Sequence, residues 1–337
     1  MASGTSKFPW LTTLIAALFA IFCGLSLSGF PRVEYKTYSP HTGSGAIFIT
    51  GCSSGIGRHA GESLAKRGWI VFCTVRNQKD VDTLNSIGIT NLRPVILDIS
   101  NAEARVSAAK DLEKVLKEEH LPLVALVNNA GVVTTDEPIE FMPISEIERV
   151  FNVNVIGAIG LTQLLLPELR KSSGRIIMIS SIAGLVRDVP GPPSGPYHAT
   201  KWALEALASA LRTELQAFGV SVSSVEPGFV KSNIGSNAKK VATVDPTYLA
   251  RITVANKIYK ELAEFNKKVD ADVDESKFDG PEVTTEVITH AIESKYPLTR
   301  YPCAHVLGIP VSVLWWMSWG LPDRLWDVIT SASRNII

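Results

Sequence analysis

The sequence predicts an α/β fold in which helices cover both faces of a doubly wound parallel sheet, with an N-terminal transmembrane helix before it and an apolar C-terminal segment after it. Two observations predict the sheet. Short runs rich in Val and Ile alternate with helical patterns, and a glycine-rich turn directly follows the first run. Such alternation implies right-handed crossovers, which make the strands parallel.

Six runs are expected to be buried strands, because each is short and is followed by turn residues. They are Ala46–Thr50, Trp69–Val75, Arg93–Asp98, Leu123–Asn128, Arg175–Ser180 and Val220–Glu226. Helical patterns cover Gly57–Arg67, Asn101–Glu119, Ser145–Lys171 and Pro196–Phe218. Ligands of such sheets bind beyond the carboxyl ends of the strands, so functional residues are expected just after the runs.

Composition excludes several classes of protein. The 337 residues hold 33 Lys and Arg against 33 Asp and Glu, and 46% are hydrophobic. This balance argues against intrinsic disorder and gives no basic footprint for nucleic acid. The four cysteines are scattered, with no CxxC pair and no histidine cluster. Neither a disulfide scaffold nor a metal site is therefore expected, and reduced thiols favour a catalytic domain facing the cytosol.

The stretch from Phe8 to Pro31 is apolar and carries no charge. About 20 helical residues suffice to cross a bilayer, so we expect an uncleaved anchor. A cleaved or organelle-targeting segment and a buried core helix are the alternatives. Arg32 and Lys36 outnumber Lys7 across the stretch, which favours a cytosolic main domain by a single charge. We expect a membrane location, the endoplasmic reticulum or a lipid droplet, and leave the side of the membrane open.

The C-terminal segment concentrates tryptophan, with four of the seven inside twelve residues: Trp315, Trp316, Trp319 and Trp326. Tryptophan prefers the boundary of a bilayer, so this segment is expected to dip into a membrane or to line a pocket, with core packing as the alternative. The expected division is an anchor and flank over 1–34, a linker over 35–45, a catalytic domain over 46–300 and the apolar segment over 301–337. Residues 231–280 are expected to form a substrate lid.

The turn Thr50-Gly51-Cys52-Ser53-Ser54-Gly55-Ile56-Gly57 joins the first strand to the first helix. Its glycines permit a tight turn and a close approach of the backbone to a pyrophosphate. The free N–H groups and the dipole of the helix N-terminus favour negative charge. We therefore expect a dinucleotide site of the Rossmann type, formed by Gly51, Ser53, Ser54, Gly55, Ile56 and Gly57.

The second strand ends in Arg76, and the first carboxylate after it is Asp80. An NAD site usually offers an acidic residue here to the ribose 2′-hydroxyl. A cation suits a 2′-phosphate instead. Arg76, with a hydroxyl from Ser54, therefore predicts NADP(H). NAD(H) is the alternative if Arg76 is only a solvated surface residue.

Tyr197 and Lys201 are four residues apart in a predicted helix, so both lie on one face, one turn apart. A free tyrosine has a pKa of about 10 and is a poor acid or base at neutral pH. A neighbouring ammonium stabilises the phenolate, so we expect a lowered pKa suited to proton transfer. The spacing alone is common, but here it follows the fifth strand and a serine-bearing loop.

Five features in this order resemble the short-chain dehydrogenase/reductase family: Thr50–Gly57, Asn128-Asn129-Ala130-Gly131, Ser181, the Tyr197/Lys201 pair and Pro227-Gly228-Phe229-Val230. The resemblance is close over residues 45–236 and looser elsewhere. The glycine turn with Arg76 is most similar to the membrane-anchored hydroxysteroid and retinol dehydrogenases.

The resemblance implies four catalytic residues. Tyr197 would be the general acid or base, and Lys201 would hold the nicotinamide ribose. Ser181 would bind the substrate oxygen, and Asn154 would position a water for a proton relay. Cofactor contacts are implied for Asp98 and Ile99 beside the adenine, for Asn129, Ala130 and Gly131, and for Pro227, Gly228, Val230 and Ser232 toward the carboxamide.

Two positions depart from the family pattern. Ser181 lies further from Tyr197 than is usual, and Pro190-Gly191-Pro192-Pro193 fills the excess. The insertion would reshape the substrate entrance or leave Ser180 as the better candidate. Ser232 stands where the family has threonine, which keeps a hydroxyl.

Together these features predict an NADP(H)-dependent oxidoreductase that interconverts an alcohol and a carbonyl by hydride transfer, without a metal. The anchor and the tail imply a lipophilic small molecule: a steroid, a retinoid or a long-chain lipid ketone. An NAD-dependent lipid alcohol dehydrogenase and a non-catalytic cofactor-binding membrane or lipid-droplet protein are the alternatives. No nucleic-acid partner is expected, and the long apolar helices leave a homodimer open.

Overall fold

The computed structural model describes residues 38, 41, 44–135, 137–186, 195–232, 234, 246–272, 274–306 and 308–322. The chain divides into two compact units, residues 1–37 and 38–337, and every element below belongs to the second. The predicted anchor, most of the predicted linker, the proline-rich insertion and Trp326 lie outside the described residues.

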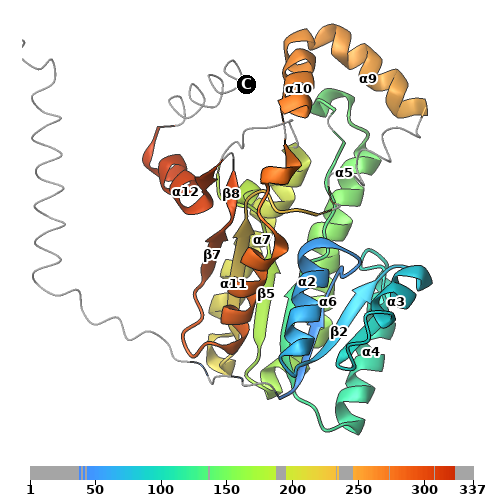
Figure 1. Cartoon of the computed structure of the whole chain (residues 1–337), viewed down its shortest axis with the longest axis vertical. Coiled ribbons are helices and arrows are strands. Elements are labelled where there is room, and N and C mark those ends of the chain that lie inside the picture. The colour runs from blue at the N-terminus through green and yellow to red at the C-terminus, as the bar shows by residue number, and fades with distance from the viewer. Residues whose placement is uncertain are drawn as a thin grey trace, which may run out of the picture. The chain divides into compact units, whose positions relative to one another are not determined.

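The described residues contain one large sheet of seven parallel strands in the order β3-β2-β1-β4-β5-β6-β7 (Figure 1). The strands are β1 Ala46–Ile49, β2 Ile70–Val75, β3 Leu92–Ile96, β4 Leu123–Asn128, β5 Arg175–Ile179, β6 Ser221–Pro227 and β7 Arg300–Cys303. The chain reverses direction across the sheet between β1 and β4, which creates the switch point where such folds bind ligands. The predicted doubly wound Rossmann sheet is thereby confirmed.

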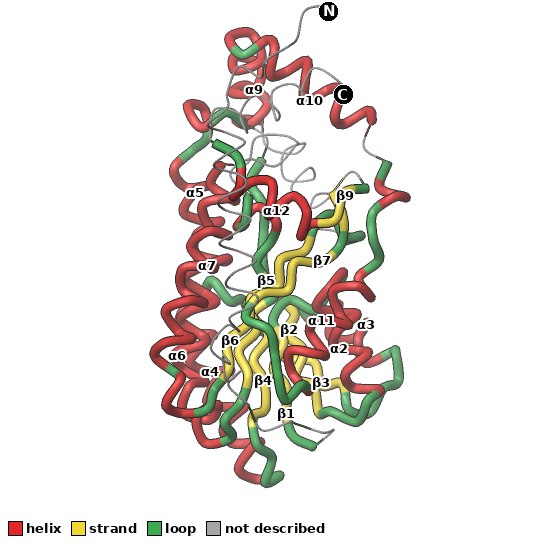
Figure 2. Tube along the Cα trace, turned by 90° about the vertical axis from the view of Figure 1, so that its left-hand side faces the viewer, coloured by secondary structure: helices red, strands yellow, loops and turns green. Residues whose placement is uncertain are grey.

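Helices cover both faces of this sheet (Figure 2). One layer holds α2 (Gly55–Lys66), α3 (Gln78–Asn85) and α11 (Pro281–Glu293), and the other holds α4 (Ala102–Glu118), α5 (Ile144–Phe151), α6 (Ala158–Lys171) and α7 (Gly195–Glu214). Successive side chains of β1 point to opposite faces of the sheet and pack against different helix layers. Ile47 and Ile49 pack with Leu64 of α2 and Ile288 of α11, whereas Phe48 belongs to the opposite core with Leu161 of α6.

A π-helical segment, Asn152–Gly157, joins α5 to α6 into one helix from Ile144 to Lys171. Within the described part of the chain, this is the one helix long and apolar enough to cross a membrane, with a mean hydropathy of 1.5. Its Leu161, Leu165 and Leu169 are buried in the core beside the sheet. Packing against the sheet therefore accounts for its apolar composition.

The sequence did not predict the seventh strand. β7 has four residues, Arg-Tyr-Pro-Cys, and lies at the sheet edge beside β6. A run this short, with an arginine and a proline, carries no clear strand pattern. It crosses the predicted boundary at residue 300, so the C-terminal segment begins as part of the sheet.

The predicted lid contains two helices that the sequence did not indicate, α9 (Pro246–Ile258) and α10 (Lys260–Asp272). α9 is tied to the loop after β4, because Arg251 Nε donates to the buried Glu137 Oε1 at 2.9 Å. The Tyr259 hydroxyl also donates to Glu140 in the 3₁₀ turn Ile139–Phe141. After β7 come the short strands β8 (His305–Val306) and β9 (Ile309–Pro310), then α12 (Val311–Gly320).

Candidate active site

The glycine turn after β1 has a shape that only glycine permits at two positions. Gly51 has a φ of +75°, and its N–H donates to Thr74 Oγ1 at 3.1 Å. A Cβ at Gly57 would fall 2.3 Å from Asn129 Nδ2. The turn therefore lies directly against the end of β4, with no room for side chains at either residue.

The N-terminus of α2 is open to an anion. Ser54 is the N-cap residue, yet within the described part of the chain its side chain makes no capping hydrogen bond, and the first turn has no acidic residue. Ser53 is exposed, and Ile56 is half-buried. The first N–H groups of α2 are thus available to a phosphate, as a dinucleotide site requires.

Thr50 and Asn129 brace the switch point. Thr50 Oγ1 accepts hydrogen bonds from the backbone N–H groups of Asn129 and Ala130, both at 2.9 Å. Asn129 Nδ2 donates back to the carbonyls of Thr50 at 2.8 Å and Gly51 at 3.0 Å. The ends of β1 and β4 are therefore held in one rigid arrangement. Asn128 is buried and donates to Thr162 instead, so it is structural.

Arg76 is exposed immediately after β2 and has no hydrogen bond or ion pair to any described residue. The carboxylate of Asp80 is engaged nearby, since Asn77 Nδ2 donates to it at 2.9 Å. The guanidinium is consequently available to a ligand at the position where this fold binds the adenosine ribose.

Asp98 and Ile99 follow β3. Asp98 is exposed, and its carboxylate accepts from the N–H and the hydroxyl of Ser100 at 2.9 and 2.6 Å. Ile99 is buried, and its carbonyl accepts from Arg105 Nη1 at 2.6 Å. Both residues have defined positions at the carboxyl end of the sheet, where an adenine contact was expected.

Asn154 lies in the π-helical segment, buried beside the end of β4. Its Oδ1 accepts from the Val132 N–H at 2.8 Å, and its Nδ2 donates to Thr200 Oγ1 at 3.0 Å and to the Val132 carbonyl at 2.9 Å. A π-bulge in a long helix often marks a functional site. Here three hydrogen bonds fix the amide in one orientation.

Lys201 is 4% exposed on α7, and its Nζ donates to the carbonyl of Ile179 at 2.9 Å. Burial lowers its pKa to about 8, while the charge of Glu205 opposes that shift. A Cβ at Gly131 would lie 3.5 Å from Asn154 Oδ1 and 3.8 Å from Lys201 Nζ. The missing side chain at Gly131 thus leaves space between the amide and the ammonium.

The Ser181 hydroxyl lies close enough to the Tyr197 phenol to act on its pKa, which it lowers. Ser181 also caps the 3₁₀ turn Ile182–Gly184 by accepting from the Ala183 N–H at 3.1 Å. Ser180 is buried and donates to the Lys201 carbonyl at 3.4 Å. Of the two serines, it is therefore Ser181 that meets the phenol.

The expected lowering of the Tyr197 pKa is not found. Burial raises the pKa of the Tyr197 phenol above its ordinary value, and the Ser181 hydroxyl acts in the opposite direction. Lys201 Nζ lies 5.5 Å from the centre of the tyrosine ring and is directed to the Ile179 carbonyl. Residue spacing brought the ammonium near the ring, but burial, and not the ammonium, decides the direction of the pKa shift.

The loop after β6 approaches the glycine turn. Gly228, next to Pro227, donates to the Cys303 carbonyl at 2.9 Å, and a Cβ there would fall 2.5 Å from the His305 carbonyl. Val230 forms a bridge with Asp279. Further along, Ser232 Cβ lies 2.8 Å from where a Cβ of Gly55 would be, so this loop reaches the phosphate end of the site.

Three threonines with positioning roles were missed as site residues: Thr50, Thr74 and Thr200. Each is adjacent to a motif or belongs to one. Thr50 opens the glycine turn, Thr74 lies two residues before Arg76, and Thr200 precedes Lys201. Their positions in or next to the motifs could have drawn attention to these threonines. The groups that their hydroxyls bond cannot be predicted from residue spacing. The described residues contain no cluster of His, Cys, Asp or Glu suited to a metal ion.

A doubly wound sheet with a glycine turn at its switch point and a tyrosine–lysine pair beside it defines an oxidoreductase that binds a nicotinamide dinucleotide. The family model for short chain dehydrogenase matches residues 45–242, and the chain belongs to the short-chain dehydrogenase/reductase family. The predicted resemblance is confirmed.

Two curated relatives and one solved structure are similar over most of the chain. Retinol dehydrogenase 16 of Mus musculus is 32% identical over 276 residues, covering 80% of this chain and 84% of its own. The mitochondrial D-beta-hydroxybutyrate dehydrogenase of Mus musculus is 31% identical over 317 residues, covering 88% and 85%. A short-chain dehydrogenase from Streptomyces avermitilis has a TM-score of 0.57 at 25% identity, covering 77% and 88%.

Proposed function

We propose that this protein interconverts an alcohol and its carbonyl on a lipophilic small molecule, with NADP(H) as its cofactor. The observation that carries the proposal is the meeting of three groups at one place: Lys201 Nζ lies 5.5 Å from the centre of the Tyr197 ring, and the Ser181 hydroxyl acts on the same phenol. Asn154 is held near Lys201, across the space that Gly131 leaves open. Substrate candidates are steroids, retinoids and long-chain lipid ketones.

The chain's residues bind, orient and move protons around the substrate oxygen. Ser181 and Tyr197 both offer hydroxyls to that oxygen, so they fix the reacting carbon in one orientation. A half-buried phenol with a raised pKa is protonated at neutral pH and can donate its proton during reduction. Asn154, fixed by Val132 and Thr200, would hold a water for proton resupply. A bound nicotinamide supplies or accepts the hydride.

Arg76 supports NADP(H) as the cofactor. Its guanidinium is exposed and has no partner among the described residues, while Asp80, the next acidic residue along the chain, accepts a hydrogen bond from Asn77. Planar guanidinium groups bind phosphate in a bidentate manner. With NAD(H), by contrast, the ribose hydroxyls would face a positive charge and no acceptor.

Two features support a lipophilic substrate and a membrane location. α12 is apolar all round and leaves Trp316 73% and Trp319 64% exposed, as suits a helix at a bilayer boundary. The uncharged stretch Phe8–Pro31 would supply an anchor. We propose the endoplasmic reticulum or a lipid droplet, with the catalytic domain in the cytosol. One relative is named retinol dehydrogenase 16, and retinol is a lipophilic alcohol.

Exposed apolar residues on two neighbouring helices support a homodimer. They are Ile156 and Leu164 on the long helix ending in α6, and Trp202 on α7.

The test is a substrate screen with the full chain in membranes, following NADPH absorbance. At least one of retinal, a steroid ketone and a long-chain ketone should be reduced, and 3-hydroxybutyrate with NAD should not be oxidised. Tyr197→Phe should abolish turnover while NADPH binding remains. Turnover of 3-hydroxybutyrate alone would overturn the lipophilic assignment.

A further inference from the structure

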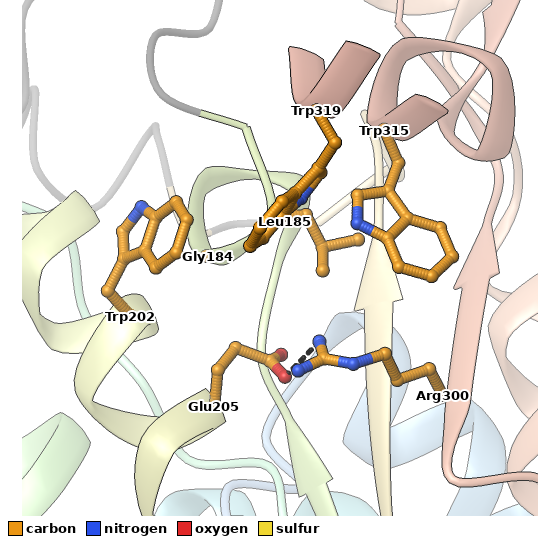
Figure 3. A pocket seen from close by; sticks show the side chains of 7 residues that line it. All are labelled: Gly184, Leu185, Trp202, Glu205, Arg300, Trp315 and Trp319. Atoms are coloured by element: carbon orange, nitrogen blue, oxygen red, sulfur yellow. Dashed lines mark hydrogen bonds and ion pairs between the residues drawn. The ribbon is translucent and has the colours of Figure 1, made fainter. Parts of the chain in front are cut away.

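A cavity of about 300 Å³ lies between α7, β7 and α12, and Tyr197 is not among the residues that line it (Figure 3). The indoles of Trp315 and Trp319 descend from α12, and Trp202 stands at the side. Opposite them lie Glu205 and Arg300. Glu205 is eight residues beyond Tyr197 on the same helix, about 12 Å along its axis. Gly184 and Leu185, which follow Ser181 closely in the chain, also line the cavity, whereas Ser181, Tyr197, Lys201 and Asn154 do not.

The floor of this cavity contains an unsatisfied acceptor. Arg300 Nη1 donates to Glu205 Oε2 at 2.5 Å and to Glu226 Oε1 at 3.3 Å. The other oxygen of Glu205, Oε1, is buried and has no hydrogen-bond partner among the described residues. The residue is 4% exposed. A buried carboxylate oxygen without a donor is unfavourable, so a ligand that supplies a donor would be stabilised here.

The charges around the floor disfavour an organic cation. Arg212 as well as Arg300 interacts electrostatically with Glu205. Glu226 accepts from Arg300 Nη1 and from the Tyr301 N–H, and burial together with the neighbouring charge of Glu205 raises the pKa of its carboxyl. Two guanidinium groups thus face two carboxyl groups, so the floor has no excess negative charge for a cation. A neutral hydrogen-bond donor suits this floor better than a quaternary ammonium group, despite the aromatic walls.

We propose that this cavity is a second ligand site, which takes a neutral amphiphile whose hydroxyl donates to Glu205 Oε1 and whose rings lie among Trp202, Trp315 and Trp319. A cavity of about 150 Å³ holds one benzene, so the volume here suits about two fused rings. Trp319 lines the cavity and is also on the exposed side of α12, so the ligand would enter from the apolar surface of that helix.

The experiment measures binding to the full chain by calorimetry, with a fused-ring alcohol and its methyl ether. 2-Naphthol should bind about tenfold tighter than 2-methoxynaphthalene, because the ether has no proton for the unpaired oxygen. Trp319→Ala should weaken 2-naphthol binding several-fold. Trp316→Ala is the matched control, since Trp316 is more exposed on the same helix and does not line the cavity. Tyr197→Phe should leave binding unchanged, which separates this site from the proposed active site.

Glu205→Gln should remove the preference for the alcohol; if this variant does not fold, the comparison of alcohol and ether in the unaltered chain still decides. Equal affinity for alcohol and ether would overturn the proposal. So would tighter binding of tetramethylammonium, which would indicate a cation site, or equal losses in Trp316→Ala and Trp319→Ala, which would indicate binding on the helix surface. The proposal would also be overturned if 2-naphthol bound the protein no more strongly than it partitions into detergent micelles without protein. The cavity would then hold only water.

Discussion

The ammonium of Lys201 donates to the carbonyl of Ile179 at 2.9 Å, which ties helix α7 to the last residue of β5. The lysine is therefore held by the sheet rather than by the tyrosine one turn before it. Because the side chain is buried, its pKa falls to about 8. The charge that is expected to hold the cofactor ribose can thus be lost within an accessible pH range.

We expect kcat/KM for the cofactor to fall as the pH rises through about 8. A lysine whose pKa is lowered is protonated below that pH and neutral above it, so the positive charge in the free enzyme disappears on the alkaline side. The measurement is a profile of kcat/KM from pH 6.5 to 9.5. Lys201→Arg should flatten the alkaline limb because arginine stays charged. An unchanged limb in that variant would assign the ionisation to another group.

Replacing Arg76 with Asp should weaken NADPH binding at least tenfold and NADH binding much less. A 2′-phosphate would lose its cation and meet a carboxylate. Fluorescence titration with both nucleotides gives the two dissociation constants. Lys79→Asp makes the same charge change at an exposed position three residues on, and should affect both nucleotides little. Equal losses for NADPH and NADH in Arg76→Asp would reject the 2′-phosphate contact.

Thr200→Val should lower kcat about tenfold without changing the dissociation constant of the cofactor. The hydroxyl accepts from Asn154 Nδ2 at 3.0 Å, so its loss leaves the amide less firmly oriented. Loss of one hydrogen bond costs about 1 kcal/mol of stability. Thr200→Ser keeps the acceptor and should retain most activity. If the serine and valine variants lose kcat alike, the hydroxyl does not position Asn154.

Gly57→Ala should abolish most cofactor binding. The added Cβ would lie 2.3 Å from Asn129 Nδ2 and 2.4 Å from the Gly51 carbonyl, so the glycine turn must shift away from β4. Overpacking of this kind costs about 1–3 kcal/mol of folding free energy. Nucleotide titration and thermal unfolding measure the two effects. Gly320→Ala, where a Cβ would meet nothing within 4 Å, should alter neither.

Arg251→Ala should loosen α9 and raise the KM for the substrate. Glu137 is 1% exposed, and without the guanidinium its carboxylate would keep, among the described residues, only the Thr135 hydroxyl at 2.7 Å. Limited proteolysis followed by mass spectrometry should show faster cleavage within residues 246–258. Lys257→Ala, on the same helix and exposed, is the control. Equal cleavage rates in the two variants would mean that this ion pair does not hold the helix.

Six strands were predictable because the signals for a buried parallel strand are local: a short run of Val and Ile, then a turn. β7 was not, since Arg300–Cys303 pairs with β6 across more than seventy residues and has no pattern of its own. The helices α9 and α10 were missed for a related reason. Their contacts, such as Arg251 with Glu137, join segments 114 residues apart.

The sequence by itself determined the class of fold, the glycine turn and the pairing of Tyr197 with Lys201, because those depend on spacing along one strand, turn or helix. Only the tertiary structure decided that Ser181 rather than Ser180 meets the phenol and that burial raises rather than lowers the Tyr197 pKa. It also decided that one oxygen of Glu205 has no hydrogen-bond partner within the described part of the chain. Desolvation and hydrogen-bond partners depend on neighbours that the fold brings from distant positions. The local pattern of residues does not predict which distant residues become those neighbours.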